Sequence, residues 1–279
     1  MMTRRDALRL FTGAAALGAT TPILKAEETS SFKHSVCRWC YPKISLEDLA
    51  VGAKEIGLSS IELLDPADWP VVQKHGLTCA MANGVTTIPD GFNRIENHAV
   101  YVPGMIDRIK ACATAGLPNV ICFSGLRKGM DDEQGLENCS VGLKQIMAEA
   151  EKQKVTVCME LLNSRVNHPD YMCDHTSWGV ELVRRVGSER FKLLYDIYHM
   201  QIMDGDIIHT IKTHHESIAH YHTGGVPDRH EIDESQELYY PAIMRAIRDT
   251  GYKGYVAQEF KPTRDPLTSL RQGVQICSV

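Results

Sequence analysis

Short apolar runs alternate with longer amphipathic stretches along most of this chain of 279 residues. The runs are four to seven residues long, which is typical of buried strands. The stretches between them have the apolar spacing of helices that pack one face against a core. The expected strands are residues 34–38, 60–64, 78–82, 120–123, 155–161, 192–197, 219–222 and 255–260. The expected helices are residues 45–56, 102–115, 137–153, 177–186, 205–215, 239–250 and 266–273.

Residues with known preferences for helix ends stand at the expected boundaries. Ser45 precedes a helix whose first turn is acidic, where a serine hydroxyl accepts a hydrogen bond from a free backbone N–H group. Gly57, Gly116 and Gly251 each follow an expected helix, at the place where a residue with positive φ ends it. The boundaries are therefore marked by more than the apolar pattern.

Eight strands that alternate with helices are expected to pair in parallel through right-handed crossovers. Two architectures fit this pattern, an open doubly wound sheet and a closed barrel. No G-x-G-x-x-G follows the first strand, which removes the main signal for a dinucleotide-binding sheet. The strand count and the length, close to the ~250 residues of a typical barrel, favour a single (β/α)8 TIM barrel over residues 27–279.

The first 26 residues have the pattern of an export signal rather than of a folded element. Arg4 and Arg5 precede a small, apolar run at 13–19, and Ala26 offers a small residue at a cleavage point. The paired arginines resemble a twin-arginine signal, which exports proteins that are already folded. We therefore expect an exported, periplasmic protein. The apolar run is too short to span a bilayer, and no later run reaches the required length.

The net charge of the chain indicates which kinds of molecule it binds. The formal net charge is −5, and removal of residues 1–26, with four basic residues and one acidic residue, takes it to −8. An acidic surface repels phosphate backbones, so nucleic acid is not an expected partner and a small-molecule substrate is.

Nine cysteines do not indicate a disulfide framework, because the count is odd and the chain is long enough to bury a large core. Cys79, Cys122 and Cys158 fall in expected strands, where a thiol behaves as a small core residue. Cys37 and Cys40 form a lone C-x-x-C, which is weak evidence for zinc. We interpret this pair as first-strand residues near the barrel mouth, and a disulfide between them is left open.

The chemistry-bearing residues gather where a barrel places its active site, at the carboxyl ends of the strands. Glu160, Asp196, His222 and Glu259 stand at corresponding places on the last four strands. Three carboxylates that converge there repel one another unless a cation or protons neutralise them. With one imidazole they form a ligand set that suits Mn²⁺, Mg²⁺, Co²⁺ or Zn²⁺.

A divalent ion that holds a carbonyl and a neighbouring hydroxyl acidifies the C–H bond between them. We expect Glu160 and Glu259 to flank the ion and to act as the acid–base pair that removes and returns the proton. His199 is placed to hydrogen-bond a substrate oxygen, and Arg229 to clamp a carboxylate or hydroxyl group.

Three segments of the second half match a known family. They are residues 195–201 with Gly205-Asp206, residues 226–231, and the stretch from Gly251-Tyr252 to Glu259. On these segments the chain resembles the hydroxypyruvate isomerase branch of the xylose-isomerase-like barrels, and the related ketose 3-epimerases are similar too. The likeness covers about the last 120 residues and is only at the level of the fold before them.

The resemblance implies a divalent metal bound by Glu160, Asp196, His222 and Glu259. It also implies that the two glutamates double as the acid–base pair and that His199 and Arg229 contact substrate. One departure concerns His222, because hydroxypyruvate isomerases tend to carry Gln at that position and the 3-epimerases carry His. A homo-oligomer is expected because members of the family often associate.

Other functions fit parts of the pattern. A ketose 3-epimerase would use the same groups and return the proton differently. A metal-dependent endonuclease on the same barrel would need further His, Asp or Glu ligands and a basic face. An exported sugar-binding barrel without catalysis would not need two carboxylates placed for proton transfer.

Glu62 is left open between a role at the pocket and an ion pair with a lysine. His220, two residues before His222 on the same strand face, is left open as a residue that orients a metal ligand. Trp39, Trp69 and Trp178 are left open between an apolar wall of the pocket and packing.

Overall fold

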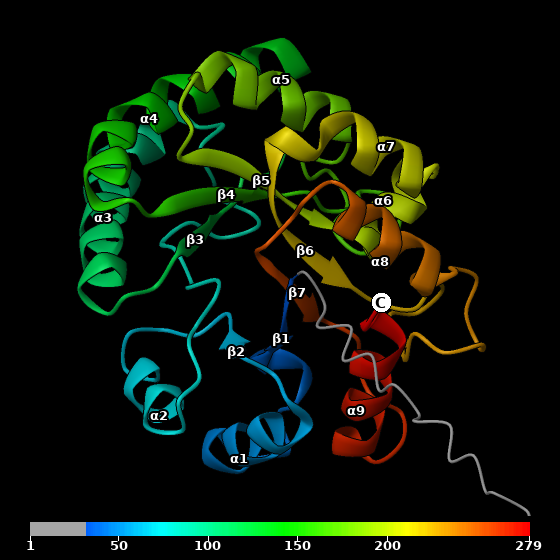
Figure 1. Ribbon diagram of the computed structural model, residues 1–279. Helices are drawn as coiled ribbons and strands as arrows, with labels where there is room; N and C mark the ends of the chain where they lie inside the picture. Colours follow the sequence, from blue (N-terminus) through cyan, green and yellow to red (C-terminus); the bar gives the residue numbers. More distant parts are fainter. Residues whose placement is uncertain (1–31) are drawn as a thin grey trace, which may run out of the picture.

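Parallel strands line the centre of the structure and helices surround them (Figure 1). The computed structural model describes residues 32–279. The export signal expected over residues 1–26 lies outside the described residues and stays a prediction. Within residues 32–279, no helix is long and apolar enough to cross a membrane.

Seven strands form one sheet in the order β2-β1-β7-β6-β5-β4-β3, and every neighbouring pair is parallel. They lie where the apolar runs predicted them, within one or two residues for most boundaries. The strands are β1 (Lys33–Cys37), β2 (Ser60–Glu62), β3 (Asn119–Cys122), β4 (Thr156–Glu160), β5 (Phe191–Asp196), β6 (Ile218–Thr223) and β7 (Tyr255–Gln258).

One of the eight expected strands, residues 78–82, is not a continuous strand in the structure. It closes the barrel between β2 and β3 through isolated bridges. Thr78 pairs with Ser60, and Ala82 pairs with both Leu64 and Val120. Between these bridges two side chains occupy the backbone groups of Ala80. The Ser60 hydroxyl accepts from its N–H at 2.8 Å, and the Asn119 side-chain amide donates to its carbonyl at 2.8 Å. The segment thus lies between β2 and β3 and completes the (β/α)8 arrangement.

The expected helices are all present, and the structure adds two that the sequence pattern did not predict. These are α2, only six residues long, and α6, which follows β5 without a loop because Asp196 both ends the strand and caps the helix. The helices are α1 (Leu46–Ile56), α2 (Trp69–Lys74), α3 (Ile95–Thr114), α4 (Asp132–Gln153), α5 (Thr176–Val186), α6 (Ile197–Met203), α7 (Ile207–His214), α8 (Tyr240–Asp249) and α9 (Pro266–Cys277), with 3-10 turns η1 (Arg38–Cys40) and η2 (His215–Ser217).

Helix ends follow the predicted chemistry. The Ser45 hydroxyl accepts from the backbone N–H of Asp48 at 3.0 Å at the start of α1. Gly57 ends the same helix with a φ of 101°. A side chain at this φ would be strained, which is why glycine suits the position.

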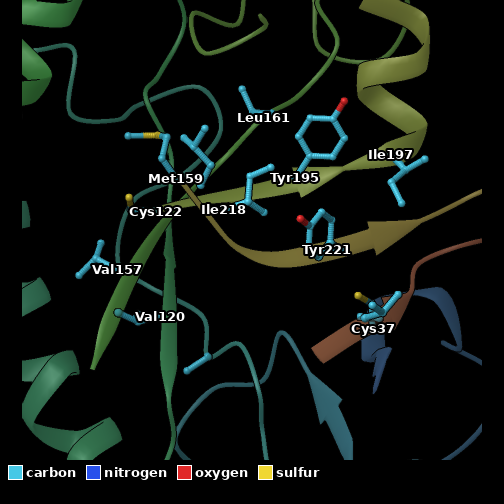
Figure 2. Packing of buried hydrophobic residues seen from close by; sticks show 14 of the residues in the cluster. Cys37, Val120, Cys122, Val157, Met159, Leu161, Tyr195, Ile197, Ile218 and Tyr221 are labelled. Carbon is cyan, nitrogen blue, oxygen red and sulfur yellow. The ribbon is translucent and has the colours of Figure 1, made fainter. Parts of the chain in front are cut away.

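Strand alternation separates the core from the site. Tyr195 on β5 and Tyr221 on β6 are paired in the register and buried, with ring centroids 6.2 Å apart (Figure 2). Their successors Asp196 and His222 are also paired and point to the opposite side of the sheet, which is the barrel interior. Packing of the tyrosines against the surrounding core therefore holds two site residues side by side.

All nine cysteines are buried free thiols. Cys79, Cys122 and Cys158 are fully buried, as expected of small core residues. Cys37 and Cys40 are not bonded to each other. Cys37 is the last residue of β1, which confirms the first-strand interpretation for it. Cys40 is the last residue of the 3-10 turn η1 that follows the strand, so the interpretation is wrong for Cys40.

Glu231 ties the long segment after β6 to the segment after β7. Its carboxylate is buried and accepts from the backbone N–H of Thr263 at 2.9 Å, the Thr263 hydroxyl at 2.8 Å and the Ser269 hydroxyl at 2.8 Å. Burial alone would raise the pKa of the Glu231 carboxyl, but these hydrogen bonds outweigh it and lower the pKa to about 2. The segment that carries Arg229 is thus anchored two residues further along the chain.

We predict that Glu231→Gln lowers the free energy of unfolding by about 2–3 kcal/mol at pH 7, because it removes charged hydrogen bonds and turns an amide towards donors. Since the folded-state pKa lies below the unfolded value, this contribution is complete above pH 4.5 and is lost as the pH falls towards 2. Urea unfolding at pH 7 and pH 3.5 should show a smaller difference from the unaltered chain at the lower pH. Glu234→Gln, at an exposed neighbouring acid, is the control. Equal losses for both variants would contradict the anchoring role.

Candidate active site

Four side chains meet at the carboxyl ends of consecutive strands, as the sequence predicted. Glu160 ends β4, Asp196 ends β5, His222 lies near the end of β6, and Glu259 directly follows β7. All four are buried, and one ligand atom from each lies within 4.8 Å of every other. We call these four residues the acid–histidine cluster.

The atoms of the acid–histidine cluster suit a cation better than a network of hydrogen bonds. His222 Nδ1 lies 2.6 Å from Glu259 Oε2 and 3.4 Å from Glu160 Oε1. Despite these short distances, neither His222 Nδ1 nor Glu160 Oε1 has a partner in hydrogen-bonding geometry among the described residues, although both are buried. Buried polar atoms without partners are costly. Three carboxylates and one imidazole nitrogen are the donors that Mn²⁺, Mg²⁺, Co²⁺ or Zn²⁺ accept, so the residues fit a divalent ion.

Arg229 supplies a positive charge to two of the acids. Its Nη2 atom lies 2.6 Å from Asp196 Oδ2 and also contacts Glu259 Oε2, while its Nε–H donates to the Glu259 carbonyl at 2.9 Å. Trp39 and Tyr198 lie against the guanidinium, with ring centroids 5.5 Å and 4.9 Å from Cζ. The Arg229 side chain is therefore held by residues of the chain itself, and its contact with a substrate stays a prediction.

His199 lies in the first turn of α6. Asp196 Oδ1 accepts from the His199 backbone N–H at 3.0 Å, so the metal-ligand candidate also positions this histidine. The ring is buried between Asn163, whose backbone N–H donates to Nδ1 at 3.1 Å, and Arg229, whose Nη1 lies 2.5 Å from Nε2. Burial lowers the pKa of His199 well below its usual value, so the ring is neutral near pH 7. A substrate contact for His199 also stays a prediction.

The structure shows the contacts of the residues whose roles the sequence left open. Glu62 is fully buried at the end of β2, and its Oε1 atom lies 2.7 Å from His220 Nε2 and 2.8 Å from His222 Nε2. Trp39 donates from Nε1 to Glu259 Oε1 at 2.7 Å. Trp69 and Trp178 instead donate to the backbone carbonyls of Leu64 and Asp132. The one sign in the sequence that Glu62 lies in the interior was its place as an acid in an otherwise mostly apolar strand.

Burial and charge move the pKa values of the two glutamates in opposite directions. Burial raises the pKa of Glu160, and the neighbouring charges of Glu259 and Asp196 act in the same direction. Burial acts on Glu259 as well, but Arg229 and His222 outweigh it and lower the pKa of Glu259 below its usual value. Two carboxyl groups in one site with separated pKa values are a common arrangement for acid–base chemistry.

A cavity of about 510 Å³ opens above the acid–histidine cluster. One side is apolar and is formed by Leu63, Ile88, Ile121, Phe123 and Leu162. The rest of the lining consists of Trp39, Asn83, Glu160, Asn167, His168, His199, Arg229, Glu259 and Lys261. A cavity of this size can hold a small metabolite.

Comparison with known proteins finds relatives in one family of barrels. Residues 53–277 match the family model described as xylose isomerase-like TIM barrel. A Danio rerio protein provisionally named hydroxypyruvate isomerase is 33% identical over 243 residues, 86% of this chain and 83% of that protein. The 2-oxo-tetronate isomerase of Haemophilus influenzae is 27% identical over 248 residues, 82% of this chain and 93% of that protein. A solved Brucella melitensis structure, described as an AP endonuclease of family 2, has a TM-score of 0.79 at 25% identity and covers 88% of this chain and 99% of that chain.

We predict that Arg229→Gln destabilises the chelator-treated protein by about 3–5 kcal/mol, because it leaves two buried carboxylates without their cation. Excess Mn²⁺ should raise the Tm of this variant more than it raises the Tm of the unaltered chain, since the ion replaces part of the lost charge. Thermal unfolding in EDTA and in Mn²⁺ measures both effects. Arg248→Gln, which removes an exposed ion pair with Asp249, is the control. A chelator-treated Arg229→Gln protein as stable as the unaltered chain would show that the guanidinium does not neutralise the acids.

Proposed function

The chain belongs to the xylose isomerase-like TIM-barrel family, and on that premise we propose that it is a metal-dependent isomerase of small hydroxycarbonyl substrates. The proposed reaction is like that of a hydroxypyruvate isomerase and proceeds by proton transfer through an enediolate. The relatives named hydroxypyruvate isomerase and 2-oxo-tetronate isomerase support an enzyme of this kind.

One observation carries the proposal more than any other. Four ligand atoms from consecutive strands lie within 4.8 Å of one another, and two of the four residues are glutamates that also line the cavity. Glu160, Asp196, His222 and Glu259 would hold the ion. When bound there, a divalent ion supplies a Lewis acid that polarises a carbonyl and its neighbouring hydroxyl.

The protein groups account for the proton transfer. One of Glu160 and Glu259 takes the proton from the carbon next to the carbonyl, and the electrons of the broken C–H bond form the C=C bond of the enediolate. The other glutamate, or the same one, delivers a proton to the adjacent carbon. The hydroxyl proton passes at the same time to the former carbonyl oxygen, so that the hydroxyl oxygen becomes the new carbonyl and the aldose–ketose interconversion is complete. Both carboxyl groups are almost fully buried, which limits their contact with bulk water.

A ketose 3-epimerase is the alternative, and His222 is the residue that favours it, because the resembling 3-epimerases carry His at this position. An epimerase would use the same two glutamates and return the proton to the same carbon from the opposite face.

Two other readings have weaker support. An endonuclease would need more metal ligands and a basic face. Among the described residues only one further group of potential ligands exists, Cys37 and Glu62 with the shared His222, and the chain is acidic. A binding protein without catalysis does not need two buried glutamates on one cavity.

The test is proton NMR of the metal-loaded protein in D2O with hydroxypyruvate, 2-oxo-tetronate, ketopentoses and ketohexoses. We expect metal-dependent incorporation of deuterium beside the carbonyl of one class of compound. Conversion between aldose and ketose forms identifies an isomerase, and inversion at C3 identifies the epimerase. No exchange with any compound, under each of several divalent ions, would remove the catalytic proposal.

We predict that Glu160→Gln and Glu259→Gln each lower turnover by about 10²–10⁴-fold, the range for lost acid–base catalysis. The amides keep the shape of the side chains but do not transfer the proton. Steady-state kinetics on the substrate identified by NMR gives the measurement, and circular dichroism confirms folding. Glu189→Gln, at a side chain 94% exposed, should leave the rate unchanged. Near-normal turnover in both active-site variants would refute the assigned mechanism.

A further inference from the structure

A buried carboxylate lies beneath the acid–histidine cluster and is not part of it. Glu62 comes from β2, on the far side of the barrel interior from β6, which carries both of its histidine partners. Because His220 and His222 are two residues apart on one strand, both rings face the interior. Their centroids are 5.2 Å apart, and Glu62 Oε1 lies within 2.8 Å of Nε2 of each ring. All three side chains are fully buried.

The two nitrogens of His222 face different neighbours. Nε2 lies against Glu62, whereas Nδ1 points into the acid–histidine cluster, 2.6 Å from Glu259 Oε2 but without a partner in hydrogen-bonding geometry. A neutral imidazole carries one proton, and an ionised carboxylate only accepts hydrogen bonds. A proton on Nε2 therefore gives Glu62 Oε1 a hydrogen bond and leaves the lone pair of Nδ1 free for a metal ion. A proton on Nδ1 would face Glu160 and Glu259 and block the position.

We propose that Glu62, itself held by His220, is a positioning residue that fixes His222 in the form that binds a metal ion through Nδ1. Hydrogen bonds of this kind from a ligating histidine to a carboxylate orient the ring and raise its affinity for the ion. The inference rests on the proposed metal-dependent function and concerns a residue that does not touch the substrate.

A second metal ion is the competing explanation, because Cys37, Glu62 and His222 Nε2 also lie together. The distances favour hydrogen bonds. The two contacts of Glu62 to nitrogen are 2.7 Å and 2.8 Å, which are ordinary hydrogen-bond lengths. Cys37 Sγ is 3.9 Å from Glu62 Oε1 and 3.8 Å from His222 Nε2.

The experiment measures metal binding rather than activity. Isothermal titration of the purified chain with Mn²⁺ and with Co²⁺ should give one equivalent of bound ion. Glu62→Gln should weaken the affinity by about 10–100-fold, the range seen when such a partner of a metal ligand is lost. The visible absorption of bound Co²⁺ should also change in Glu62→Gln, since His222 is no longer held in place. Cys37→Ser, which alters a neighbour of the same two side chains, should keep both the affinity and the spectrum.

His220→Asn provides a second variant that leaves Glu62 in place and removes its other partner. We expect a smaller loss of affinity than in Glu62→Gln, and this variant decides the question if Glu62→Gln does not fold. An unchanged affinity and Co²⁺ spectrum in the folded variant would overturn the positioning role. A second equivalent of ion that Cys37→Ser abolishes, or a thiolate-to-Co²⁺ charge-transfer band, would overturn it in favour of a second metal site. Absence of ion binding by the unaltered chain would remove the proposed function and this role with it, whereas unaltered binding in Glu62→Gln would remove this role alone.

Discussion

Repulsion among buried carboxylates is the constraint on which the rest of the site depends. Glu160, Asp196 and Glu259 come from three strands that converge on one mouth, where little water is available to screen their charges. Arg229 compensates part of that charge from the loop after β6. His222, on β6, presents Nδ1 without a hydrogen bond to the same space. The chain therefore keeps an arrangement that costs stability locally, and the surrounding barrel must be rigid enough to hold it.

The barrel supplies that rigidity through strand register. Pairing of β5 with β6 sets Asp196 beside His222, while the tyrosines that precede them pack on the outer side of the same strands. Asp196 also caps α6 by accepting from the His199 backbone N–H, and it contacts the Arg229 guanidinium. With the neighbouring His222 ring, the carboxylate thus has three groups close to it. Each contact restricts the others, so the side chain has little freedom to turn away from the cluster.

Sequence reasoning located the barrel and the acid–histidine cluster because both depend on local patterns. Apolar runs mark strands, and the residue that ends a parallel strand lies at the mouth wherever the barrel is closed. Other features depend on contacts between distant segments. The interruption at residues 78–82 arises because Ser60 and Asn119, far apart in sequence, both bond to Ala80. The partners of Glu62 lie 158 and 160 residues away, and no pattern within β2 reveals them. The burial of Arg229 against the acids likewise could not be read from its loop.

The cavity draws its two sides from different halves of the chain. The carboxylates, imidazoles and cations of the lining follow β4 to β7, whereas the apolar side chains, Leu162 apart, come from segments before β4. The residues proposed for the reaction and most of the apolar residues that a substrate in this cavity would contact are thus encoded in separate stretches of the gene. On the proposed function, mutations in the early loops would alter the apolar side of the cavity and leave the proposed acid–base residues in place. This modularity makes the scaffold readily evolvable, and it directs library design for altered selectivity to residues 63–123.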